Sequence, residues 1–291
     1  MIATAVSKAE LDEAVRTGRS CAVAVSCARA LTEHARSYPR LFPPALFDTG
    51  LFTSIGLVSA FGSPHAGADE LIVVSRAALL VFALDHHFDL AEAGQVHDLV
   101  ETCLAAADGA PPGNAAAELV TDLRTQLASR ASLTHLHTLW REQLHRFLQA
   151  QLHSWGWRTE GRLPGTLPAY MAIADGCGSA LVNLSHWIAT ADSAALAVLE
   201  HLQQAGAEVQ NYLRLLNDLA TATREADRDI NALALGFPLE QITHAMDAHA
   251  ARALELICAV DDQAPREALY LRRQLAFNTG FYQGADYWGT A

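Results

Sequence analysis

Apolar residues recur at intervals of three and four along most of this chain, which is the spacing of one face of an α-helix. Alternation with a period of two, which is typical of half-buried strands, is almost absent. The pattern predicts helices over 8–38, 50–61, 68–92, 94–108, 113–130, 133–154, 167–190, 192–223, 239–260 and 264–284. We therefore expect an all-α protein.

Short segments rich in Gly and Pro separate these helices, at 38–44, 61–67, 108–114, 156–166 and 236–238. None of them is long or of low complexity, so nothing marks a flexible linker between domains. No repeat of 20–50 residues is visible, which disfavours a solenoid. We expect one all-α, bundle-like domain over 1–291, in which 1–45 form an N-terminal segment that need not be fully ordered.

Charge and cysteine usage narrow the class of protein. The net charge of -12 argues against binding to nucleic acid or to an anionic membrane, although divalent cations can still bring an anionic ligand to an acidic protein. The five cysteines are scattered, without a Cys-x-x-Cys pair, so we expect neither a disulfide framework nor a zinc site. No signal peptide is visible, and the most apolar window, 71–84, is too short to span a bilayer and contains Arg76. These features predict a soluble, cytoplasmic protein.

Two predicted helices carry oxygen-bearing side chains where an apolar interior is expected. Asp85 and Asp89 are four residues apart and share one helix face, although like charges at that spacing repel. Asn217, Thr221 and Glu225 form a second stripe with the same spacing. Local helix stability gives no reason for either stripe.

The donor types indicate a hard divalent cation. Carboxylate, amide and hydroxyl oxygens suit Mg²⁺ or Mn²⁺, and Mg²⁺ commonly takes one or two carboxylates and completes its coordination with water and substrate phosphate. Arg214 lies three residues before Asn217, close to the same helix face, and its planar guanidinium matches phosphate oxygens. Two facing stripes would hold a metal cluster with a diphosphate between them.

The two stripes carry a resemblance to a known family. "NDLATATRE" (217–225) is similar to the second metal-binding motif of class I terpene synthases, and "DHHFD" (85–89) resembles their aspartate-rich motif. "RLLND" (214–218) resembles the bacterial kaurene-synthase-type diterpene synthases, in which an Arg three positions ahead of the Asn contacts the diphosphate. The order and spacing of the motifs extend the resemblance over about 60–290.

The resemblance implies a single-domain helical bundle around a central active-site cavity, three Mg²⁺ ions with Mn²⁺ as an alternative, and a prenyl diphosphate substrate. It implies these metal ligands: Asp85, Asp89, Asn217, Thr221 and Glu225. It assigns ionisation of the substrate to Arg214, Asp85 and Asn217, and diphosphate contacts to Arg214, Arg224 and Tyr287. Candidate residues of the cavity wall are Phe82, Gly178, Trp187, Tyr212, Phe281 and Trp288. The family breaks a helix where Gly176 and Gly178 stand, and its members are usually homodimers.

Three positions depart from the family pattern. His86 replaces the second aspartate of the first motif, which leaves Asp85 and Asp89 as its metal ligands. Ala174 stands where the diphosphate-sensing arginine is expected, so Arg214 takes that role. Of the C-terminal Arg-Tyr pair only Tyr287 is present, with Asp286 at the arginine position.

These observations predict a Mg²⁺-dependent class I diterpene synthase acting on a bicyclic, copalyl-type C20 diphosphate. No Asp-x-Asp-Asp motif is present, so a separate class II cyclase would make the bicycle. Direct cyclisation of linear geranylgeranyl or farnesyl diphosphate is the nearest alternative, and a non-catalytic helical binding protein is a distant one. A chain-elongating prenyltransferase is disfavoured because Lys8 is the only lysine, and an HD-type phosphohydrolase because "HDLVE" (97–101) lies too close to the first motif.

Overall fold

The structure is a computed structural model of the whole chain. It describes residues 7–225 and 230–288, apart from the side chains of Asp175, Thr223, Arg224 and Glu225. Within these ranges every regular element is helical, which confirms the all-α prediction. The elements are α1 (Lys8–Arg36), α2 (Thr49–Gly62), α3 (Ala68–Leu90), α4 (Ala93–Ala107), α5 (Ala115–Leu127), α6 (Ala131–Glu160), α7 (Leu167–Met171), the 3-10 turn η1 (Ala174–Gly176), α8 (Ser179–Thr190), α9 (Ser193–Ala197), α10 (Leu199–Glu225), α11 (Leu239–Val260) and α12 (Pro265–Tyr282).

Three of the predicted helix ranges were wrong. The range 167–190 is divided into α7, η1 and α8, and the range 192–223 is divided at Val198 between α9 and α10. Asp192 caps α9 by accepting hydrogen bonds from two backbone N–H groups. α6 runs on to Glu160 instead of ending at 154, and Gly161 ends it in the left-handed conformation with φ 67°. Hydrophobic spacing did not reveal these ends because they depend on capping and backbone conformation.

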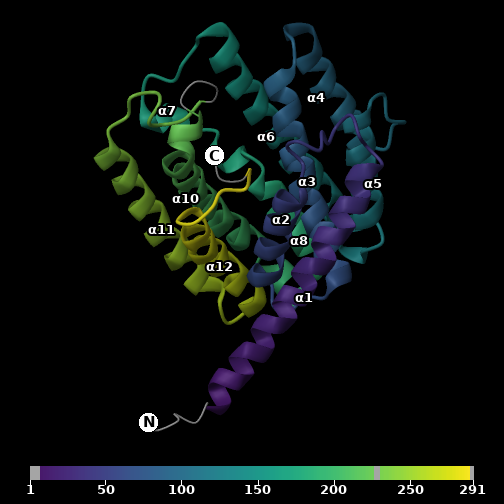
Figure 1. Cartoon of the computed structure of the whole chain (residues 1–291), viewed down its shortest axis with the longest axis vertical. Helices are drawn as coiled ribbons and strands as arrows, with labels where there is room; N and C mark the ends of the chain where they lie inside the picture. The colour runs from purple at the N-terminus through teal and green to yellow at the C-terminus, as the bar shows by residue number, and fades with distance from the viewer. Residues whose placement is uncertain (1–6, 226–229, 289–291) are drawn as a thin grey trace.

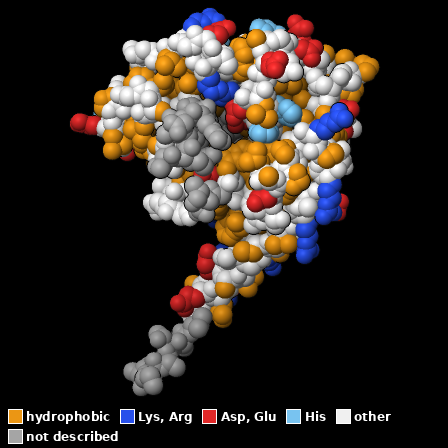
Figure 2. Space-filling view, turned by 45° about the horizontal axis from the view of Figure 1, so that its top comes forward, with side chains coloured by type: hydrophobic (Ala, Val, Ile, Leu, Met, Phe, Trp, Pro, Cys, Tyr) orange, Lys and Arg blue, Asp and Glu red, His pale blue; other side chains and the backbone are white. Residues whose placement is uncertain are grey.

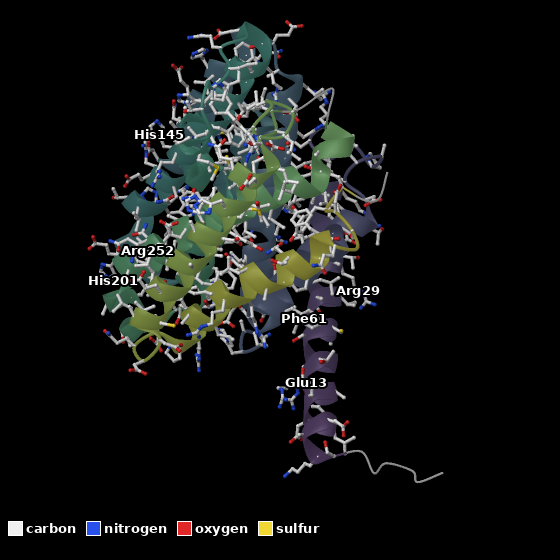
Figure 3. All side chains as sticks on the ribbon, turned by 90° about the vertical axis from the view of Figure 1, so that its left-hand side faces the viewer. Glu13, Arg29, Phe61, His145, His201 and Arg252 are labelled. Carbon is white, nitrogen blue, oxygen red and sulfur yellow. The ribbon has the colours of Figure 1, made fainter. Side chains whose placement is uncertain are left out.

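Helix α1 lies partly outside the body of the molecule (Figures 1 and 3). Ser7 and Glu10 form a capping box at its start, and residues 8–19 are all exposed. Glu13, labelled in Figure 3, belongs to this protruding part, and Figure 2 shows hydrophobic and charged side chains mixed on it. From Ser20 onward the buried residues Ala24, Cys27 and Leu31 attach α1 to α2 and α3.

Helix α3 crosses the centre of the bundle. By length and composition alone it could cross a membrane, and it extends well beyond the apolar window recognised in the sequence. However, 56% of its most apolar stretch is buried inside the protein, where it packs against α1, α2, α5, α6 and α8. That is the position of a core helix.

The remaining helices complete the bundle (Figure 1). α10 packs against both α11 and α12, α12 reaches back to α2, and α6 contacts α3 and α8. The segment after α12 returns across one end of the bundle, where the Trp288 ring packs edge-on against Phe82 of α3 at 5.3 Å. Helices from both halves of the chain therefore pack together in one bundle.

Candidate active site

A cavity of about 280 Å³ occupies the centre of the bundle. Its wall comes from α2, α3, α6, α8, α10, α12, the turn η1 with Cys177, and the segment 286–288. Its apolar lining side chains include Ile55, Val58, Val74, Ala78, Val81, Phe82, Val182 and Leu213.

One end of the cavity, which we term the polar end, is lined by Asp85, Arg158, Arg214, Asn217, Tyr282 and Asp286. Asn217 of α10 donates a hydrogen bond to the hydroxyl of Tyr282 of α12 at 2.9 Å. The Tyr287 ring packs on Tyr282 and on Phe82 of α3, both at 5.7 Å between ring centres. These contacts bring the ends of α3, α10 and α12 together.

The two aspartates of the first motif lie in different surroundings. Asp85 lines the cavity, whereas Asp89 is not among the residues of the cavity wall. The Asp89 carboxylate instead pairs with the guanidinium of Arg158 on α6 at 2.5 Å. Arg158 also donates a hydrogen bond to the backbone carbonyl of Phe88 at 3.4 Å. An arginine at the end of α6 thus joins the first motif to the cavity.

The second motif contributes Asn217 directly. Thr221 is buried, and its hydroxyl donates to the backbone carbonyl of Asn217 at 2.8 Å. The side chains of Arg224 and Glu225, predicted to contact diphosphate and metal, lie outside the described part of the chain, and so do residues 226–229. Asn217 and Asp85 are the two predicted metal ligands that line the cavity within the described residues.

Arg214 belongs to a buried hydrogen-bonded network and also lines the cavity. Its Nε donates to the Tyr170 hydroxyl at 2.6 Å, and its Nη2 donates to the Ile230 carbonyl at 2.7 Å. The Tyr170 hydroxyl in turn donates to Asp218 Oδ2 at 2.7 Å, and Asp218 also accepts from the Ala232 backbone at 3.3 Å. Burial is the main reason why the pKa of Tyr170 lies well above its ordinary value. Asp218 is a motif residue that holds the start of the 230–238 segment and does not face the cavity.

The helix break predicted from the resemblance is present in the structure. Gly178, at the start of α8, has φ 119°, a conformation that L side chains rarely adopt. A Cβ at this position would meet Val81 Cγ1 of α3 at 2.4 Å. Ala174, which stands in place of the expected arginine, is buried and lines the cavity. The break sets η1 and α8 tightly against α3.

The structure divides the predicted aromatic wall residues into two groups. Phe82 and Trp288 line the cavity, and so does Tyr287, which was predicted as a diphosphate contact. Trp187 is buried in the core, Tyr212 is bonded through its hydroxyl to Thr279, and Phe281 packs on Phe277; none of the three, nor Gly178, is among the lining residues of the described chain. Helical periodicity marks all of these positions as inward-facing, but it does not distinguish core from cavity.

Several wall residues were missed in the sequence: Gln151, Arg158, Gln210, Tyr270, Gln274, Asn278, Tyr282 and Asp286. On α12 the spacing of four residues between Tyr270, Gln274, Asn278 and Tyr282 was a readable signal of a polar inner stripe. Arg158 gave no such signal because its segment was interpreted as a loop.

The donors at the polar end fit Mg²⁺ that is shared with a substrate. The described residues contain no group of three or more His, Cys, Asp or Glu side chains able to hold a metal ion by themselves. Asp85, Asn217 and Asp286 nevertheless present hard oxygen donors around one end of one cavity. Mg²⁺ characteristically binds through one or two carboxylates and completes its octahedron with water and phosphate oxygens.

Comparisons with known proteins agree with this architecture. The family model "Terpene synthase family 2, C-terminal metal binding" matches residues 76–235, which is more than half of the chain and includes both motifs. The ent-pimara-9(11),15-diene synthase of Streptomyces sp. (strain KO-3988) is 24% identical over 267 residues, covering 88% of this chain and 90% of that protein.

Two solved structures show the same fold. The 2-methylisoborneol synthase of Streptomyces coelicolor A3(2), in complex with Mg²⁺ and geranyl-S-thiolodiphosphate, aligns with a TM-score of 0.71 at 17% identity, over 92% of this chain and 90% of that one. The linalool/nerolidol synthase of Streptomyces clavuligerus, in complex with 2-fluorogeranyl diphosphate, aligns with a TM-score of 0.68 at 13% identity, over 89% and 94% of the two chains.

Proposed function

The chain belongs to terpene synthase family 2, whose metal-dependent members are lyases acting on prenyl diphosphates, and from this premise we propose that it is a class I diterpene synthase acting on a bicyclic, copalyl-type C20 diphosphate. The observation that carries the proposal is the meeting of Asp85, Arg214 and Asn217, from two distant motifs, at one end of the same cavity. The similarity to an ent-pimaradiene synthase supports a C20 substrate.

Each group at the polar end has a role in ionisation. When bound, Mg²⁺ acts as a Lewis acid on the diphosphate leaving group. Asp85 and Asn217 hold the cation, with Asp89, Thr221 and Glu225 as further ligands of the same two motifs. Arg214 contacts the diphosphate with its guanidinium, and Arg224 and Tyr287 complete the diphosphate contacts.

Arg158 places a second guanidinium at the polar end, close to Asp89. Ala174, at the position of the expected arginine, carries no charge. Arg158 and Arg214 therefore together supply the positive charge that the leaving diphosphate requires. Val81, Phe82 and Trp288 of the cavity wall shield the allylic cation from water, and the faces of the Phe82 and Trp288 rings stabilise it.

We further propose the following domain organisation, location, oligomeric state and partner for the enzyme. The whole chain forms one catalytic domain in the cytoplasm, and it works as a homodimer. A separate class II cyclase forms the bicyclic substrate upstream, and Mg²⁺ ions, three in number, are replaceable by Mn²⁺.

The test is incubation of the purified protein with Mg²⁺ and, separately, copalyl, geranylgeranyl and farnesyl diphosphates. Diphosphate release is measured by a coupled phosphate assay, and products are identified by gas chromatography with mass spectrometry. We expect turnover of a copalyl diphosphate. If copalyl diphosphates are inert while geranylgeranyl or farnesyl diphosphate reacts, the linear-substrate alternative is correct. If no diphosphate is released from any of them, the synthase proposal fails.

A further inference from the structure

The end of the cavity opposite the polar end, which we term the floor, is polar, although a carbocation cyclase needs an inert wall. The floor consists of Ser59, Gln210, Tyr270 and Gln274, all of which line the cavity and are more than 90% buried. α10 rises about 1.5 Å per residue, so Gln210 lies roughly 10 Å deeper than Asn217. Polar groups so far from the diphosphate are not explained by metal or diphosphate binding.

Two of these amides are left without a full set of hydrogen bonds. Among the described residues, Nε2 of Gln210 and Oε1 of Gln274 are buried and have no partner. The other end of the Gln274 amide is fixed, because Nε2 donates to Asn183 Oδ1 at 2.6 Å. A buried amide group without a partner costs about 1–3 kcal/mol, which is why such groups in native proteins commonly bind ordered water.

A second hollow lies directly behind the floor. It has a volume of about 60 Å³ and is lined by residues of α6, α8 and α10. Three buried polar atoms around it have no partner among the described residues: Gln143 Oε1, Asn183 Nδ2 and Trp187 Nε1. One acceptor and two donors are the set that a single buried water satisfies.

Asn183 connects this hollow with the floor. Its Oδ1 accepts hydrogen bonds from the Tyr270 hydroxyl at 3.0 Å and from Gln274 Nε2, both in the cavity wall. Its Nδ2 faces the hollow and lies close to Gly206 of α10, 3.4 Å from where a Cβ would stand if this residue were alanine. Gly206 is one helical turn before Gln210 on α10, so Asn183 lies within about one turn of both orphaned floor amides.

We propose that the floor of the cavity binds the water that ends the reaction, so that this enzyme forms a terpene alcohol. The proposal rests on the synthase function and adds the fate of the cation to it. Gln210 Nε2 donates to the water oxygen, and Gln274 Oε1 accepts one of its protons. The hollow behind Asn183 holds a second water as a reserve.

The chemical step is balanced. A lone pair of the water oxygen forms the new C–O bond with the terminal carbocation, and no bond of the carbon skeleton breaks. The resulting oxonium gives its excess proton to Gln274 Oε1, and the proton passes to solvent when the site opens. Without an oriented water, the cation would instead lose a proton from carbon and give a hydrocarbon.

The decisive experiment is turnover in water enriched in ¹⁸O, with diphosphate release and products measured in the same samples. We expect an alcohol as the main product, carrying ¹⁸O. Diphosphate release with hydrocarbon products alone would overturn the inference and leave the proposed function intact. An alcohol without ¹⁸O would also overturn it, because the oxygen would then come from the substrate. No release from any of the three substrates would refute the proposed function, and the inference with it.

Three variants assign the effect to the floor. In Gln274→Leu and Gln210→Leu the ratio of alcohol to hydrocarbon should fall about tenfold, the effect of losing one hydrogen bond to the water. Gln126→Leu is the matched control, because Gln126 Oε1 is also buried without a described partner but lies outside the cavity and the hollow. Its product ratio should equal that of the unmodified protein. Equal ratios in all three variants would contradict the assignment.

A crystal structure that resolves water gives a readout independent of turnover. We expect an ordered water within hydrogen-bonding distance of Gln210 Nε2 and Gln274 Oε1, and another one in the hollow between Gln143, Asn183 and Trp187. A dry floor would overturn the inference whatever the substrate.

Discussion

Replacement of Asp218 by Ala should destabilise the protein, whereas replacement of its neighbour Asn217 should remove activity with little loss of stability. Both residues belong to the same motif, but only Asn217 lines the cavity. Asp218 is 1% exposed, accepts hydrogen bonds from Tyr170 and from the Ala232 backbone, and lies 3.4 Å from Arg214 Nε. Its carboxylate joins α7, α10 and the segment after 230.

The magnitude follows from these contacts. Removal of one partner of a buried ion pair costs about 3–5 kcal/mol, and the partial exposure of Arg214 places this pair at the lower end. An unfolding entropy of about 2.1 cal/mol/K per residue gives roughly 0.6 kcal/mol/K for a chain of 291 residues. The melting temperature of Asp218→Ala should therefore fall by about 5 °C or more. Asn217→Ala loses one hydrogen bond, worth about 1 kcal/mol, and should melt only about 2 °C lower.

Circular dichroism at 222 nm, recorded during heating, measures both melting temperatures, and diphosphate release measures activity. The reasoning is refuted if Asp218→Ala melts like the unmodified protein but has no activity, because Asp218 would then act as a metal ligand. It is equally refuted if Asn217→Ala remains fully active.

Three further results are expected. Asp85→Ala should lose turnover and keep its melting temperature, and full activity would remove Asp85 from the metal site. Gly178→Ala should lower the free energy of unfolding, measured by chemical denaturation, by at least about 1–3 kcal/mol. The loss has two causes, the φ of 119° and the contact of the new Cβ with Val81. The added substitution Val81→Ala should recover only the part due to the contact. Complete recovery would show that the backbone is not strained. Burial lowers the pKa of His186 from 6.5 to about 3. Between pH 6.5 and about pH 3, therefore, the His186 imidazole is protonated in the unfolded state but not in the folded state. Stability should therefore fall by about 2 kcal/mol between pH 7 and pH 5, measured by urea denaturation, and His186→Gln should lack this part of the pH dependence. An unchanged pH dependence in the variant would contradict the assignment.

The sequence predicted the helices and the chemistry of the two motifs because both depend on residue type and spacing within one helix. Asp85 and Asn217 line one cavity, as the resemblance of their two motifs implied. The pairing of Asp89 with Arg158 could not be predicted, because it depends on how far α6 extends. That length is set by the Gly161 cap and not by hydrophobic periodicity.

The cavity wall could not be predicted to the same degree. Trp187 and Phe82 are both inward-facing aromatic residues, and only their neighbours decide that one lies in the core and the other at the cavity. The polar floor was missed because Gln210 and Gln274 belong to no motif, and their significance appears only when the structure shows that their amide atoms are buried without partners.

The central claim is that Asp85, Asn217 and Arg214 form a site for Mg²⁺ and diphosphate. Its most direct test is the melting temperature of the protein with Mg²⁺ and inorganic diphosphate together, compared with each alone and with the Asn217→Ala variant. A ligand present at 100 times its dissociation constant stabilises the folded state by about 2.7 kcal/mol, which corresponds to roughly 4 °C for this chain. We expect a rise of this size only when both ligands are present, and a much smaller rise in the variant. No rise with both ligands present, or an equal rise in the variant, would contradict the account.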